Sequence, residues 1–203
     1  MPTDAVAAAP TRYATALPQV ELISLVPRPE PFDDPAWIFE PRYDGFPAVL
    51  YHSEEGCDIE VLQETALPLQ DLRDRVAEVL GSREAILAGQ IVALDRRGKP
   101  QLQHLLRAEG YLAFAAQDLL WIDGADLRDR PLRYRKQRLA QLLPEDSGPL
   151  YKVLTIEEHG RALFGASRRL DLGGILAKCQ DDPYAPGTVW YAIPNPARPA
   201  PLT

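Results

Sequence analysis

Short hydrophobic runs separated by polar links recur along most of the chain, and this pattern predicts a structure built mainly from strands. Several β-prone runs are separated by short polar links, which are typical of hairpins and antiparallel pairing. The first two runs flank a polar loop that contains Gly56. The predicted strands cover residues 47–52, 57–62, 85–95, 111–122, 174–179 and 188–193.

Helical periodicity is confined to four segments. Apolar positions from Leu69 to Leu80 recur at helical spacing, and Gly81 is expected to end that helix. A further helix is expected to begin at Thr155, because Glu158 three residues later completes a capping box. Shorter leucine patterns predict helices within 102–106 and 132–143. Strands outnumber helices, so the predicted fold class is α+β with mostly antiparallel sheet.

Composition and proline placement predict one globular domain between two tails. A chain of 203 residues with 46% apolar content is long enough to bury a core. Seven of the 20 prolines lie in residues 1–36 and six lie in residues 183–203. We therefore expect a disordered Ala/Pro-rich tail at 1–20, a domain at 21–194 and a Pro-rich tail at 195–203.

Charge and cysteine content narrow the function classes. A net charge of −7 disfavours a general nucleic-acid coat or a polybasic membrane anchor. No apolar run approaches the roughly 18 residues of a membrane span, and the N-terminus lacks a signal-peptide pattern, so we expect a cytoplasmic protein with no membrane contact. Two distant cysteines indicate reduced thiols, and the three histidines show no zinc-ligand spacing.

Five short motifs resemble those of one protein family. Residues 40–48 read E-P-R-Y-D-G-F-P-A and resemble E-x-K-Y-D-G-x-R-A, the first motif of ATP-dependent DNA ligases. The later motifs of that family are L-D-G-E-I-V-x-L-D, F-D-L-L-x-x-D-G, E-G-I-V-A-K and W-x-K-x-K. Their counterparts here lie at 87–95, 117–124, 173–178 and 190–194, in the same order and spacing. The chain resembles in particular the ligase domain of bacterial end-joining ligase D.

This resemblance implies an adenylation domain of the nucleotidyltransferase fold. Such a domain has antiparallel sheets flanked by helices, with an ATP cleft between the sheets. The family uses ATP and magnesium and carries a C-terminal OB-fold, which is expected to be missing here because the sequence ends just after the last motif.

The family's catalytic residues are replaced at most motif positions. Arg42 stands where the family has the lysine that attacks the α-phosphate of ATP, and Gly173 stands at the metal-associated glutamate. The adenine-stacking aromatic corresponds to Gln117. The remaining replaced positions are Pro47 for an arginine, Ala88 and Gln90 for an aspartate and a glutamate, and Ala192 and Pro194 for two lysines.

These replacements predict that adenylyl transfer is lost. An attacking lysine must lose its proton, whereas a guanidinium stays protonated at any pH below roughly 12 and is a very poor nucleophile. Only four of the 22 basic residues are lysines. The leading interpretation is a catalytically inactive ligase-like domain that binds or scaffolds. The alternative is an active nucleotidyltransferase or DNA ligase that uses a displaced lysine, either Lys178 or Lys152.

Some motif residues are retained, and they have two interpretations. They can serve as scaffold, through backbone geometry, core packing and local hydrogen bonds. Alternatively, they form a vestigial nucleotide or phosphate pocket that binds without turnover. No metal site or cofactor is expected, because the carboxylates that would hold magnesium are gone. The pocket residues would be Arg42, Asp44, Gly45, Asp118, Lys178 and Trp190.

A basic cluster at 128–138 is a second candidate site. Arg133, Arg135 and Lys136 could lie along a phosphate backbone, or the cluster could be structural, as the matching family pattern favours. The expected partners are DNA or a DNA-repair protein such as a ligase, a polymerase or a nuclease.

Overall fold

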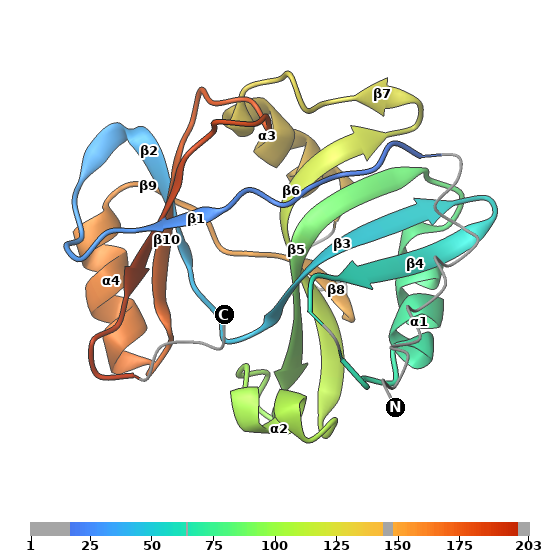
Figure 1. Cartoon of the computed structure of the whole chain (residues 1–203), viewed down its shortest axis with the longest axis horizontal. Helices are drawn as coiled ribbons and strands as arrows, with labels where there is room; N and C mark the ends of the chain where they lie inside the picture. The colour runs from blue at the N-terminus through green and yellow to red at the C-terminus, as the bar shows by residue number, and fades with distance from the viewer. Residues whose placement is uncertain (1–16, 64, 144–147, 199–203) are drawn as a thin grey trace, which may run out of the picture.

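The computed structural model describes residues 17–63, 65–143 and 148–198, and it consists of two sheets that face each other (Figure 1). The predicted α+β class is confirmed. Nearly all strand pairs are antiparallel, and the exceptions are β1 with β11 and β6 with β8. The five-stranded sheet has the order β1 (Leu25–Pro27), β11 (Trp190–Pro194), β10 (Gly174–Cys179), β2 (Asp34–Pro41) and β9 (Ile156–Glu158).

The six-stranded sheet contains the longest predicted strands. Its central pair, β5 and β6, keeps almost every residue buried, as expected for apolar runs of this length. Its order is β4 (Gly56–Val61), β3 (Phe46–Ser53), β5 (Ala85–Leu94), β6 (Tyr111–Ile122) and β7 (Ala125–Asp126), and β8 (Leu150–Lys152) pairs with β6.

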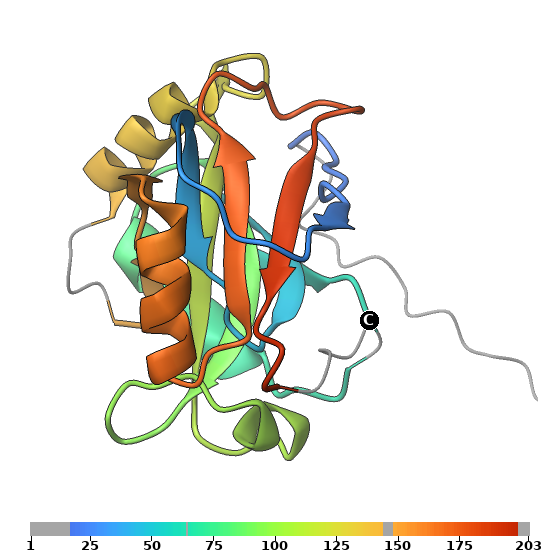
Figure 2. The ribbon, with the colours of Figure 1, turned by 90° about the vertical axis from the view of Figure 1, so that its left-hand side faces the viewer.

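Helices cover the outer faces of the sheets. The apolar stripe of α1 (Gln70–Leu80) packs into the core of the six-stranded sheet, and Gly81 ends this helix as predicted. The short α2 (Leu102–Leu106) and α3 (Leu132–Leu142) also match their predicted segments, and both contribute to that core. The fourth helix, α4 (Gly160–Arg169), packs on β2 and β10 (Figure 2). In the described part of the chain, no helix has the length and apolar character needed to cross a membrane.

The prediction that a helix begins at Thr155 is wrong. Residues 156–158 form β9, and α4 begins five residues later, at Gly160. Ile156 pairs with Phe39 of β2, so tertiary pairing overrides the local capping signal. The Thr155 hydroxyl hydrogen-bonds Glu40 instead of capping a helix, at 3.3 Å.

The predicted tails are too long at both inner boundaries. Leu17 is buried, and the Val20 amide donates a hydrogen bond to the Tyr51 hydroxyl at 3.1 Å. At the other end, Asn195 is buried and Arg198 forms ion pairs, so residues 195–198 pack on the domain. The rest of the predicted tails, 1–16 and 199–203, lies outside the described residues.

Two segments connect the sheets. The loop at 42–45 carries the chain from β2 of one sheet to β3 of the other. The strap, which we define as residues 17–27, packs on the six-stranded sheet at Leu17 and then pairs with β11 of the five-stranded sheet as β1 (Figure 1). Both segments border the space between the sheets.

Candidate functional site

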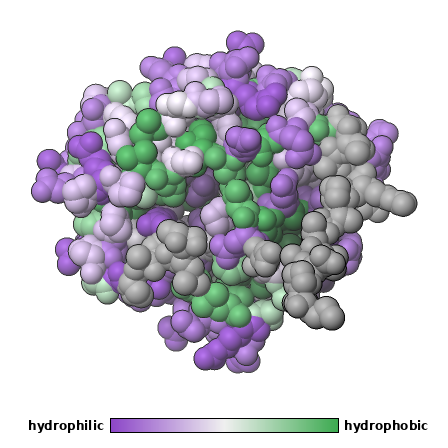
Figure 3. Space-filling view, viewed as in Figure 1, coloured by the Kyte–Doolittle hydropathy of each residue, from purple (hydrophilic) through white to green (hydrophobic). Residues whose placement is uncertain are grey.

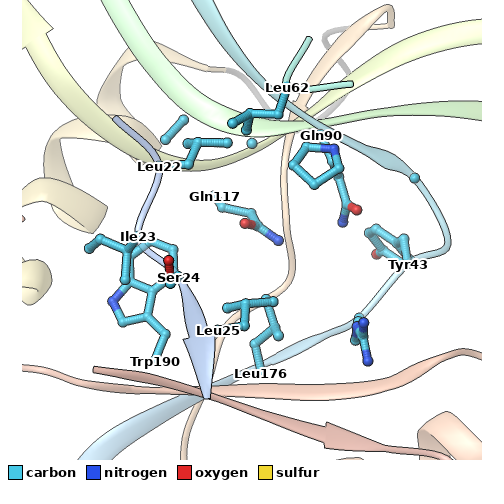
Figure 4. Close-up of a pocket in the computed structure, with 15 residues that line it drawn as sticks. Leu22, Ile23, Ser24, Leu25, Tyr43, Leu62, Gln90, Gln117, Leu176 and Trp190 are labelled. Carbon is cyan, nitrogen blue, oxygen red and sulfur yellow. The ribbon is translucent and has the colours of Figure 1, made fainter. Parts of the chain in front are cut away.

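A cavity of about 330 Å³ lies between the two sheets (Figure 4). One wall comes from the six-stranded sheet, and the opposite wall comes from Leu176 of β10 and Trp190 of β11. The strap closes one side and the 42–45 loop closes the other, as Ile23 and Tyr43 show on opposite sides of Figure 4. The remaining lining residues are Leu22, Ser24, Leu25, Arg42, Gly45, Pro47, Leu62, Ala88, Gly89, Gln90 and Gln117.

Three adjacent strands contribute to the wall formed by the six-stranded sheet, and two of the side chains they place there, Gln90 and Gln117, are polar. Ala88 and Gln90 alternate with Gly89 along β5 and therefore share a face, and Pro47 of β3 pairs with Gln90. On β6 the register shifts between the partners of Ala88 and Gly89, so Gln117 is the extra residue of a β-bulge. A bulge re-aims a side chain locally, and here the Gln117 amide points into the cavity (Figure 4).

Arg42 supplies the positive charge of this cavity. Burial lowers the pKa of the Arg42 guanidinium, and the nearby Asp44 carboxylate opposes that shift. Asp44 itself pairs with Arg198, whose Nη2 lies 2.6 Å from Asp44 Oδ2. Within the described residues, the Arg42 side chain makes no hydrogen bond or ion pair, so its guanidinium is available to an anion.

The loop can pass close to β5 because Gly45 has no side chain. A Cβ at Gly45 would lie 2.6 Å from the carbonyl oxygen of Ile91. Gly173 is crowded from another direction, because a Cβ there would lie 2.7 Å from Asp44 Oδ1. Asp44 therefore occupies space next to the position where the family pattern has a metal-associated glutamate.

Lys178 lies outside the cavity, behind Trp190. Its amine is fully buried, 2.7 Å from Glu40 Oε2 and 3.8 Å from the centre of the Trp190 ring. Lys136 pairs with the other oxygen of Glu40. Burial acts to raise the pKa of Glu40, but the charges of Lys136 and Lys178 outweigh it and lower that pKa. Burial also lowers the pKa of Lys178 to about 8, against the attraction of Glu40.

Asp118 and Arg135 form a second buried ion pair. Arg135 Nε and Nη2 donate to the two carboxylate oxygens of Asp118, both at 2.9 Å, and neither side chain is exposed. Arg135 Nη1 also donates to the carbonyl oxygens of Arg130 and, at 3.1 Å, of Asp182. This pair fixes α3 against β6 and belongs to the core.

Two of the three side chains predicted as nucleic-acid contacts are held in ion pairs with buried carboxylates. Arg135 is fully buried and Lys136 is largely buried against Glu40, so neither side chain presents a free cation to a phosphate backbone. Arg133 remains exposed, and it pairs with Asp181. In the sequence, the charged residues of α3 are indistinguishable from a solvated helix face. The buried carboxylates that pair with Arg135 and Lys136 come from distant strands and are identified only in the folded chain.

The structure brings together only some of the predicted pocket residues. Arg42, Gly45 and Trp190 line the cavity, whereas Asp118 and Lys178 are held in buried ion pairs away from it. Among the replaced motif positions, the cavity lining includes Arg42, Pro47, Ala88, Gln90 and Gln117 but not Gly173, Ala192 or Pro194. Sequence reasoning missed the apolar lining from residues 22–25, Leu62 and Leu176, which carries no motif signal.

A separate groove beside α3 contains Lys152, together with Tyr43, Tyr151 and Leu154. Tyr43 lines both spaces, but Lys152 does not line the cavity that holds Arg42. No lysine and no carboxylate lines that cavity within the described residues, and these residues contain no group of three potential metal ligands. The lining therefore does not fit a divalent cation.

The two sheets around this cavity have the nucleotidyltransferase fold of ATP-dependent ligases. The fold matches the solved structure of mycobacterial DNA ligase D complexed with ATP and MES, with a TM-score of 0.72 and 23% identity. The match covers 84% of this chain and 58% of that one.

Sequence comparison names the relatives. The chain is 31% identical over 170 residues to the multifunctional non-homologous end joining protein LigD of Pseudomonas aeruginosa, covering 78% of this chain and 19% of that protein. It is 31% identical over 166 residues to a DNA ligase of Natronomonas pharaonis, covering 73% of this chain and 30% of that ligase. No protein-family model matches the chain. The chain spans less than a third of the length of these two relatives, and it resembles the adenylation domains of ATP-dependent DNA ligases, including that of LigD.

Proposed function

We propose that this chain is a catalytically inactive DNA-ligase-like domain that serves as a binding or scaffold module in DNA repair or end joining. The observation that carries the proposal is the charge of the cavity between the sheets. Arg42 is the one charged side chain among its described lining residues, and none of the four lysines reaches it. A site of this composition holds an anion but offers no amine to attack a phosphate.

The chemistry of Arg42 supports loss of the first reaction step. Burial lowers the pKa of Arg42, but a guanidinium remains a delocalised cation under conditions in which a lysine can be deprotonated. The transferred phosphoryl group also needs cations and metal-bound carboxylates around it. The wall contributes Ala88, Gln90 and Gln117 where the family pattern has two carboxylates and an aromatic ring.

The displaced-lysine alternative is opposed by the positions of both candidates. Lys178 has a lowered pKa, which favours a nucleophile, but its amine is enclosed by Glu40 and Trp190. Lys152 lies in the groove beside α3. Either lysine would need a rearrangement of the ion pairs or strands that hold it before it could approach a phosphate bound near Arg42.

Adenylate formation is the direct test. The purified chain is incubated with α-labelled ATP and magnesium or manganese, denatured, and examined for a covalent label by gel and by mass spectrometry. The LigD ligase domain of Pseudomonas aeruginosa serves as the positive control. We expect no label on the wild type or on Arg42→Lys, because the supporting groups are absent too. A covalent adenylate on the wild type overturns the proposal, and recovery by Arg42→Lys alone shows that the other replacements matter little.

The proposed partners are DNA or a repair protein such as a ligase, polymerase or nuclease. The relatives' names, DNA ligase and end joining protein, support this assignment. Apolar surface also gathers toward the middle of the face seen in Figure 3, and two residues that line the cavity, Leu25 and Leu62, are exposed. The free thiols of Cys57 and Cys179 agree with the reducing cytoplasm proposed as the compartment.

A further inference from the structure

We infer that the groove beside α3 docks an extended segment of a partner protein that carries an apolar residue between acidic residues. The inference rests on the proposed function, because a scaffold module needs a surface for a protein partner. The groove has a volume of about 660 Å³, and among the described residues it shares only Tyr43 with the lining of the Arg42 cavity. It is therefore a separate site with its own chemistry.

An open strand edge is the first reason for this inference. Among the described strands, β8 pairs with β6 alone, so its other edge has no neighbouring strand. The Pro149 carbonyl oxygen and the Val153 amide are both hydrogen-bonded to β6, at 2.6 and 2.9 Å. Backbone groups alternate between the two edges of a strand, so the N–H and C=O groups of Lys152 face away from β6.

The backbone groups of this edge are free to pair with another chain. Lys152 and Leu154 both line the groove, and within the described residues neither has a hydrogen-bond partner for its N–H or C=O group. A strand edge with free groups of this kind is a template for pairing with an added extended chain. In this mode of recognition, backbone hydrogen bonds give affinity, and pockets for alternate side chains give specificity.

The apolar part of the lining indicates the nature of one partner side chain. Leu139 and Ala140 of α3 lie along the groove, together with Val153 and with Ile38 of β2. Leu154 is 56% exposed there, so a large apolar side chain remains in contact with water. Side chains of an added strand alternate in direction, and an apolar residue on the groove side would remove this surface from water.

The charge of the lining indicates acidic neighbours for that apolar residue. The lining contains three cations and one carboxylate, from Arg133, Lys136, Lys152 and Glu157. The Lys152 ammonium has no ion-pair partner among the described residues, whereas Lys136 and Arg133 pair with Glu40 and Asp181. The chain as a whole has a net charge of −7, so this groove is a local exception that acidic side chains complement.

A peptide matches the groove better than a nucleic acid does. A phosphate backbone would also attract the cations of the lining. It has neither the N–H and C=O groups that pair with the open edge at Lys152 nor an apolar side chain to cover Leu154. The edge, the exposed leucine and the charge together therefore favour an extended acidic and apolar peptide.

Fluorescence anisotropy of labelled peptides tests the inference with the full chain. The probes are short peptides in which Leu, Ile or Phe lies between Asp or Glu residues, and matched peptides that carry Ser or Lys at the acidic positions. We expect saturable binding of the acidic peptides, binding at least about tenfold weaker for the Ser peptides, and none for the Lys peptides. Added salt should weaken the acidic complexes, because part of the attraction is between exposed charges.

Amide hydrogen exchange followed by NMR locates the bound peptide. An added strand would accept hydrogen bonds from the free amides of Lys152 and Leu154, so exchange at these two amides should slow by at least about tenfold at saturation. The amides of α2 lie outside the groove and serve as the internal control, with no expected change.

Variants assign the contacts. Lys152→Glu should weaken binding of the acidic peptides by at least about tenfold and should bind the Lys peptides in their place. Lys99→Glu, at a lysine outside the lining of the groove, is the matched control and should bind like the wild type. Leu154→Ser should also weaken binding of the acidic peptides, whereas Leu170→Ser, at a leucine of similar exposure outside the groove, should not.

Four results would overturn the inference: no saturable binding of the acidic peptides, binding without protection of the Lys152 and Leu154 amides, protection of these amides by an oligonucleotide instead of a peptide, or a dimer of this chain that protects them. Sedimentation at increasing concentration detects the dimer. Circular dichroism verifies that each variant folds, and the wild-type exchange data decide alone if the variants do not. The adenylation assay is independent of these measurements. Absence of peptide binding with no adenylate refutes only this inference, whereas a covalent adenylate refutes the proposed function.

Discussion

The buried pair Arg135–Asp118 permits a sharp test of the distinction between core and nucleic-acid surface. Replacing Arg135 by Met leaves the Asp118 carboxylate fully buried, with the Leu119 amide as a remaining hydrogen-bond donor at 2.9 Å. Breaking such a pair by removing one partner costs about 3–5 kcal/mol of stability. We therefore expect Arg135→Met to lower the free energy of unfolding by about that amount.

The matched control is Arg133→Met, two residues earlier on the same helix. The Arg133 side chain is 60% exposed and pairs with the equally exposed Asp181, so its loss should change stability by no more than about 1 kcal/mol. Replacing both buried partners, in Arg135→Met/Asp118→Leu, should recover most of the loss, because no uncompensated charge remains.

Urea unfolding followed by circular dichroism and tryptophan fluorescence measures the wild type, these three variants and the single variant Asp118→Leu. The double-mutant cycle then isolates the coupling between Arg135 and Asp118. If Arg135→Met were no more destabilising than Arg133→Met, the assignment of Arg135 to the core would be refuted, and its role as a nucleic-acid contact would have to be reconsidered.

Two further predictions concern the buried lysine and the crowded glycine. The folded chain releases the Lys178 proton near pH 8 and the unfolded chain near pH 10.5, so unfolding takes up a proton between these values. In urea titrations, the stability of the wild type relative to Lys178→Met should therefore rise with pH across that window. A difference that does not change with pH would contradict the burial of the amine. Gly173→Glu should lose about 1–3 kcal/mol in the same assay, because the new side chain displaces Asp44 from Arg198, whereas the control Gly165→Ala, which has space in α4, should not destabilise the chain.

Much of the fold could be predicted from local pattern. The runs that became β3, β5 and β6 are long, apolar and bounded by turn residues, and the α1 stripe ends at Gly81 as expected. The strands β2 and β9 escaped prediction, because β2 begins and ends beside prolines and β9 has only three residues. Thr155 illustrates the physical limit, since its capping box is a valid local signal that pairing between β9 and β2 overrides.

The candidate site was predictable where it coincided with motifs. Arg42, Gln90 and Gln117 stand at motif positions and do line the cavity. Burial of Lys178 against Glu40 could not be read from the sequence, because the two residues are 138 positions apart and meet only through pairing of β10 with β2. The apolar lining of the cavity could not be predicted either, because the sequence pattern around a leucine that lines a cavity does not differ from that around a leucine in the core.

The strap and the 42–45 loop affect both the rate at which a ligand exchanges and the entropy that its binding costs. The covalent chain joins the two sheets on both sides of the cavity, so the sheets cannot spread apart without breaking the pairing of β1 with β11 or moving Gly45 away from β5. The space between them is shaped during folding and is ready before any ligand arrives. Binding then orders little additional backbone, so its entropic cost falls mainly on the ligand and on side chains such as Arg42. Exchange is expected to be limited by passage through the opening beside Leu25 and Leu62, and not by a hinge motion of the sheets.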